Sequence, residues 1–99
     1  MAPGWRTADA EFIAKQEGID LTADHWQVIG ALQSYFSRHI DQRILPRELH
    51  DALEEKFHSK GGIKFLYGIL PGGPIAQGCR LAGIQPPAGT TDTGFGSVV

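Results

Sequence analysis

Apolar side chains recur at helical intervals along most of this chain. The clearest case begins at Pro46, where Leu49, Ala52, Leu53 and Phe57 stand at positions i, i+3, i+4 and i+8 and so share one helix face. The same pattern, read together with the residues at each end, predicts four more helices. The five expected helices span residues 7–16, 23–39, 46–57, 63–70 and 74–82. Their short links predict an all-α fold, a compact orthogonal bundle.

Residues with strong positional preferences mark the ends of two of these helices. Thr22 suits the N-cap of the second helix, and Asp24 lies in its first turn, where the helix dipole favours an acid. Pro74 suits the first position of the last helix, because its fixed φ fits and its missing N–H would have no partner there. Gly83 suits the position just past the end of that helix, where a left-handed conformation closes the last turn.

The largest apolar side chains predict a single core, with Trp5 packing against it as an anchor. The expected core residues are Trp26, Phe36, Leu53, Phe57 and Leu66. His25, next to Trp26, is interpreted as structural, because the nearest other histidine, His39, follows fourteen positions later and the two lack a ligand-like spacing. We therefore expect no metal site and no cofactor.

Composition and charge narrow the possibilities further. Hydrophobic residues make up 41% of the 99 positions and charged residues 20%, which is ordinary for a folded domain. Residues 1–87 are expected to form one domain. The arm at Pro86 and Pro87 leads into a flexible tail, residues 88–99, with three glycines, three threonines and one charge. No apolar run is long enough to cross a bilayer and no signal peptide is present, so a cytoplasmic protein is expected.

The single cysteine, Cys79, lies in the basic half of the chain. It excludes an internal disulfide framework. Residues 1–55 hold five basic and ten acidic residues, a balance of −5, whereas residues 56–99 hold four basic residues and one acid, a balance of +3. This asymmetry favours either a thiolate at Cys79 or an acidic partner. A solvated basic surface without a role is the other interpretation, and the sequence leaves both open.

The segment from Phe65 to Gly89 carries the residues that point to a family. Nine of its positions fall in register with the C-terminal pattern of the DsrC/TusE family, which this chain resembles: Leu66, Tyr67, Pro71, Gly73, Pro74, Gln77, Ala82, Gly83 and Pro87. The resemblance continues back through Phe36, His25-Trp26, Glu17-Gly18-Ile19 and Trp5, about nine-tenths of the chain. It implies a helical sulfur-relay protein. The β-hairpin that precedes this region in family members is expected to be absent, since only Met1 to Gly4 come before Trp5.

The resemblance also implies where sulfur would be carried. Family members hold it as a persulfide on a cysteine near the chain end, and the matching position here is Thr90, whose hydroxyl cannot form a persulfide. A second cysteine, present in some members eleven positions earlier, matches Cys79. Cys79 is therefore the candidate sulfur-bearing residue, with a buried structural cysteine as the alternative. The candidate binding residues are Arg80, Lys64, Gln77, Pro87 and Thr90.

Three functions remain open from the sequence. The first is a sulfur relay docking to a sulfite reductase or a sulfurtransferase, as a monomer. The second is a regulatory or docking relative that carries no sulfur. The third, a helix-turn-helix nucleic-acid binder, is disfavoured by the acidic face of the third helix, which would repel phosphates: Glu48, Asp51, Glu54 and Glu55. No catalytic triad, paired-carboxylate site or nucleotide loop is present, so we expect no catalysis by the chain on its own.

Overall fold

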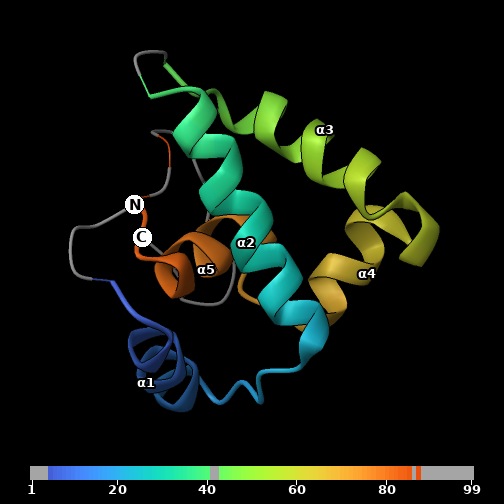
Figure 1. Cartoon of the computed structure of the whole chain (residues 1–99). Coiled ribbons are helices and arrows are strands. Elements are labelled where there is room, and N and C mark those ends of the chain that lie inside the picture. The colour runs from blue at the N-terminus through green and yellow to red at the C-terminus, as the bar shows by residue number, and fades with distance from the viewer. Residues whose placement is uncertain (1–4, 41–42, 86, 88–99) are drawn as a thin grey trace, which may run out of the picture.

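In the part of the chain that the structure describes, the fold consists of five α-helices and one short 3-10 helix, as the computed structural model in Figure 1 shows. The structure describes residues 5–40, 43–85 and 87. The elements are α1 (Thr7–Glu17), α2 (Ala23–Arg38), α3 (Pro46–Lys56), η1 (His58–Lys60), α4 (Gly62–Ile69) and α5 (Pro74–Ala82). The predicted all-α class and five helices are confirmed, with helix ends shifted by one residue at most, and the described ranges contain no strand.

Helix α5 lies at the centre of the bundle. It packs against α1, α2, α3 and α4, and eight of its nine residues are buried. Only Arg80 remains partly exposed. Figure 1 shows α5 crossing α2, with α1 on one side and α3 and α4 on the other. Because every face of α5 is covered, this short helix organises the core rather than adding to its edge.

A glycine permits the closest approach to this central helix. A Cβ atom at Gly78 would lie 2.7 Å from Cδ1 of Leu32, and Cδ1 of Leu70 and Cγ1 of Val28 would also be within 4 Å. Leu32 and Val28 belong to α2 and are fully buried. A side chain at position 78 would therefore require Leu32 to shift, and a close-packed core leaves little room for that.

His25 joins the start of α2 to the end of α4. Thr22 is the N-cap of α2, as predicted, and its backbone N–H donates to Nδ1 of His25 over 3.0 Å. Because Nδ1 accepts, the ring proton of the neutral side chain is on Nε2, which donates to the carbonyl of Ile69 at 2.8 Å. His25 is 5% exposed, and both of its ring nitrogens are engaged in hydrogen bonds within the fold. The structural interpretation of this histidine is confirmed.

The expected core is correct for three of its five residues. Leu53, Phe57 and Leu66 are buried together. Trp26 and Phe36 are only partly buried and pack against the core, so their prediction as core residues was wrong. Both lie on α2, whose buried Val28 and Leu32 lie opposite Gly78 of α5. Gly78 of α5 lets Val28 and Leu32 approach it closely.

The ends of the chain lie outside the description. The predicted flexible tail, residues 88–99, and the short segment ahead of Trp5, on which the missing β-hairpin was argued, both fall outside the described residues. None of the helices in the described ranges is long and apolar enough to cross a membrane.

Candidate functional site

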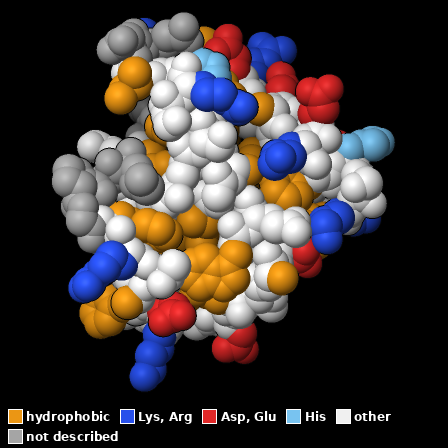
Figure 2. Space-filling view, in the orientation of Figure 1, with side chains coloured by type: hydrophobic (Ala, Val, Ile, Leu, Met, Phe, Trp, Pro, Cys, Tyr) orange, Lys and Arg blue, Asp and Glu red, His pale blue; other side chains and the backbone are white. Residues whose placement is uncertain are grey.

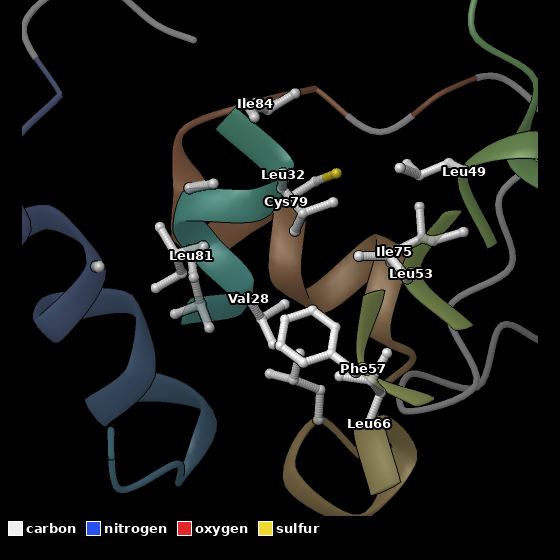
Figure 3. Packing of buried hydrophobic residues seen from close by; sticks show 14 of the residues in the cluster. Val28, Leu32, Leu49, Leu53, Phe57, Leu66, Ile75, Cys79, Leu81 and Ile84 are labelled. Carbon is white, nitrogen blue, oxygen red and sulfur yellow. The ribbon is translucent and has the colours of Figure 1, made fainter. Parts of the chain in front are cut away.

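The site is centred on Cys79, which lies in the third quarter of α5. Its side chain has no solvent exposure, and it is a free thiol. Figure 3 shows its sulfur inside the core, close to Leu32 of α2 and pointing toward the side that holds Leu49 of α3. Both leucines are fully buried. The buried alternative that the sequence left open for Cys79 is therefore the arrangement observed.

Burial makes this thiol a weak acid. Desolvation raises the pKa of Cys79 to about 12, and the nearby positive charge of Arg80 lowers it by much less than burial raises it. With that pKa, only about one thiol in 100,000 is ionised at pH 7. The thiolate is the species that attacks a sulfur donor, so Cys79 is unreactive toward such donors in this conformation.

Gln77 and Arg80 converge on one carboxylate, that of Glu17 at the end of α1. Arg80 donates from Nε to Oε2 of Glu17 at 2.8 Å and from Nη2 to Oε1 at 3.1 Å, a two-pronged ion pair. Nε2 of Gln77 donates to Oε1 of Glu17 at 2.8 Å, while its Oε1 accepts the N–H of Gly72 at 2.9 Å. Two of the predicted binding residues are thus brought together, and both are engaged in holding α1 on α5.

These partners stabilise the charged form of the Glu17 carboxylate. Burial opposes its charged form, but the hydrogen bonds from Arg80 and Gln77 and the charge of Arg80 outweigh burial, so the pKa of Glu17 is lowered. The sequence reasoning did not single out Glu17 for this role. The signal was present: an acid at the C-terminal end of a helix is disfavoured by the helix dipole, which indicates that it has a partner elsewhere in the fold.

The remaining candidate residues lie apart from Cys79. Lys64 is exposed on α4, and the half-exposed Tyr67 follows it three positions later on the same helix. Pro87 is partly buried, and Thr90 lies outside the described residues. Over the ranges that the structure describes, no three His, Cys, Asp or Glu side chains lie close enough together to hold a metal ion.

Comparison with known proteins agrees with the family resemblance. Residues 2–90 match the family described as DsrC like protein. The TusE sulfurtransferase of Yersinia pseudotuberculosis is 33% identical over 84 residues, which are 84% of this chain and 77% of that protein. The TusE sulfurtransferase of Salmonella paratyphi A is 34% identical over the same length, 84% of this chain and 76% of that protein.

A solved structure shares the arrangement of helices. The NMR structure of Allochromatium vinosum DsrC superposes with a TM-score of 0.71 and 35% sequence identity, covering 88% of this chain and 78% of the DsrC chain. A sequence match along nearly the whole chain and a fold match of this extent lead to the same assignment. The chain belongs to the DsrC/TusE family of sulfur-relay proteins.

Proposed function

We propose that this protein acts in sulfur relay as a docking member of its family, one that binds a relay partner without itself carrying sulfur. The observation that carries the proposal is the complete burial of Cys79, which is the only cysteine among the 99 residues. A persulfide carrier must present its sulfur to two proteins in turn, the donor and the acceptor. A thiol inside the core can do neither without opening the fold.

The packing of α5 supports this proposal. Cys79 lies on the helix that contacts α1, α2, α3 and α4, and its side chain has no solvent exposure. Exposing its sulfur requires this core packing to open, and openings of a packed core are rare in a stable domain.

Thr90 supports the same conclusion from the sequence. It is the position that matches the carrier cysteine of the family, and a threonine hydroxyl is neither acidic nor soft enough to hold a persulfide near neutral pH. Neither of the two family cysteine positions then offers an accessible thiolate, and docking is the family property that remains.

The partner follows from the family. Members of the DsrC/TusE family work in sulfur relay with protein partners, and we propose that this chain docks as a monomer to a sulfite reductase or a sulfurtransferase. Bound there, it would occupy the place of a cysteine-bearing relative and so regulate the flow of sulfur. Its lone thiol, without a disulfide partner, fits a reducing compartment, and we place its action in the cytoplasm.

Competition with a cysteine-bearing relative tests the proposal. Allochromatium vinosum DsrC, loaded with persulfide, is mixed with a sulfite reductase or sulfurtransferase that accepts its sulfur, and this protein is added in increasing amounts. The expected result is a fall in the rate of sulfur transfer, with binding to the acceptor measurable by calorimetry. An unchanged rate together with no binding to either class of acceptor contradicts the docking function.

A further inference from the structure

A groove on the surface runs between α2 and the end of α3, away from Cys79. Its volume is about 540 Å³, within the range of protein ligand sites. Figure 2 shows hydrophobic side chains at the surface between α2 and α3, with Lys or Arg side chains beside them. The lining residues come from α2, the end of α3 and η1: Gln27, Gly30, Ala31, Ser34, Arg38, Lys56, Phe57, Ser59 and Lys60.

The charged residues of this groove are all cations. Lys60 pairs with Asp24 over 2.9 Å, from Nζ to Oδ1. Arg38 and Lys56 have no carboxylate partner among the described residues. Arg38 and Lys56 thus bring two positive charges, without a carboxylate partner in the described part of the chain, to one concave surface, where an anionic occupant would be attracted. Charge complementarity therefore points to a ligand with more than one negative group.

A glycine at the base of the groove, Gly30, leaves space there but makes helix α2 less stable than an alanine would. Gly30 lies in the interior of α2, where glycine is less favourable than alanine because it loses more backbone freedom on folding. A Cβ at this position would meet no atom within 4 Å outside its own helix backbone and neighbours, so packing in the described part of the chain does not require a glycine. The half-buried Ala31 and the buried Phe57 complete an apolar base.

The length of the groove distinguishes a peptide from a small anion. The α2 residues that line it run from Gln27 to Arg38 on one helix face, a rise of roughly 16 Å. A free phosphate ion is much shorter and would contact one or two of the cations. An extended peptide of about five residues matches this length. Side-chain hydroxyls at Ser34 and Ser59 and the amide of Gln27 add hydrogen-bonding groups for its backbone.

We infer that this groove docks an acidic, extended segment of a partner protein, with its carboxylates toward Arg38 and Lys56 and its backbone over Gly30. The inference rests on the proposed docking function for the identity of the partner, a relay protein, while the chemistry of the segment follows from the groove itself. Binding of this kind weakens as salt concentration rises, because the cations are exposed.

A labelled acidic peptide tests the inference on the full chain. The probe is a fluorescent peptide of about six residues in which glutamates alternate with alanines, and its affinity is followed by fluorescence anisotropy. The double variant R38E/K56E should weaken binding by about tenfold or more, which corresponds to the loss of about 1.4 kcal/mol. The control is K15E, a single charge reversal on the exposed face of α1 and outside the groove. It should bind the peptide as the wild type does.

Amide chemical shifts of the isotope-labelled protein locate the bound peptide. Shifts should move at Gly30, Ala31, Ser34 and Ser59, and inorganic phosphate should not reproduce them. Equal losses for R38E/K56E and K15E, shift changes spread over every basic surface, or the same shift pattern with phosphate alone would each overturn the inference. Filling the base with Gly30→Leu provides a second variant, which should lower affinity without changing any charge.

Intact partners separate this inference from the proposed function. If a sulfurtransferase or sulfite reductase binds R38E/K56E as tightly as the wild type, the groove is not the docking surface, although the docking function stands. If the peptide binds in the groove but no relay protein binds the chain, the docking function fails and the groove remains an acidic-peptide site.

Discussion

The indole Nε1 of Trp5 donates a hydrogen bond of 2.9 Å to the carbonyl of Leu81, 76 positions later in the chain. This bond fixes the segment ahead of α1 against the end of α5. Gly83, two residues past Leu81, lies directly against the indole ring, which a Cβ at position 83 would overlap. The predicted anchoring role of Trp5 is thus confirmed, and its partner is the glycine that also closes α5.

Two glycines that end helices give a matched pair for testing this contact. Gly18 after α1 and Gly83 after α5 have nearly the same left-handed backbone, with φ of 74° and 73°. A Cβ at Gly18 meets nothing within 4 Å, whereas one at Gly83 meets Trp5. Gly18→Ala should therefore cost about 1–2 kcal/mol in backbone strain alone. Gly83→Ala should cost about 2–5 kcal/mol, since it adds overpacking. Urea unfolding followed by circular dichroism compares the two, and equal losses would contradict the Trp5 contact.

The ion pair between Glu17 and Arg80 predicts a pH-dependent contribution to stability. Side-chain exposure is 14% for Glu17 and 29% for Arg80, and charged hydrogen bonds of this kind contribute about 1.5–3 kcal/mol. Glu17→Gln should lower the free energy of unfolding at pH 7 by that amount. In the folded state the pKa of Glu17 lies below its ordinary value of 4.5. The contribution of Glu17 to stability should therefore be fully present above pH 4.5. It should be lost as the pH falls below that value, because the carboxylate then becomes protonated.

Two comparisons isolate the effect of Glu17. Glu11→Gln, on the exposed face of the same helix, should change stability by no more than about 0.5 kcal/mol. The pKa of Glu54 is also lowered, chiefly by the hydrogen bond from the N–H of Ile63, but Glu54 is present in both proteins and cancels in the difference. A stability difference between wild type and Glu17→Gln that stays constant from pH 7 to pH 3 would show that the ion pair does not stabilise the fold.

Gly30 predicts a change that improves stability and weakens binding. Gly30→Ala removes the entropy cost of glycine in a helix interior and meets no steric barrier, so it should stabilise the protein by about 0.5–1 kcal/mol. The added methyl group reduces the depth of the groove, and affinity for the acidic peptide should fall. Thermal unfolding and fluorescence anisotropy on the same sample measure both effects. A stabilised variant with unchanged affinity would mean that the peptide does not lie over Gly30.

The local signals in the sequence were sufficient for the helices and their ends. Pro74 and Gly83 mark the limits of α5 because their backbone preferences act within one turn of the chain. The same holds for Thr22 at the start of α2. These preferences do not depend on what the helix later packs against, and the predicted bounds were accordingly close.

Features that depend on contacts between distant segments were not predicted. The position of α5 at the centre rests on contacts with α1, α2, α3 and α4, and the periodicity of its nine residues does not reveal those contacts. The pairing of Glu17 with Arg80 joins residues 63 positions apart. The groove forms only where α2 meets the end of α3, so its residues look like ordinary exposed positions in the sequence. For Cys79, the sequence left two interpretations, and tertiary packing decides between them.

Intact mass spectrometry after incubation with a persulfide donor tests the central claim most directly. The native protein is compared with a Thr90→Cys variant cut after Thr91, which restores a thiol at the position of the family's carrier cysteine. The account predicts that the native protein gains no sulfur, because Cys79 is buried and its pKa is raised to about 12, while the variant gains one sulfur atom. A gain of one sulfur on the native, folded protein, abolished by Cys79→Ser, would contradict the account and make Cys79 a carrier.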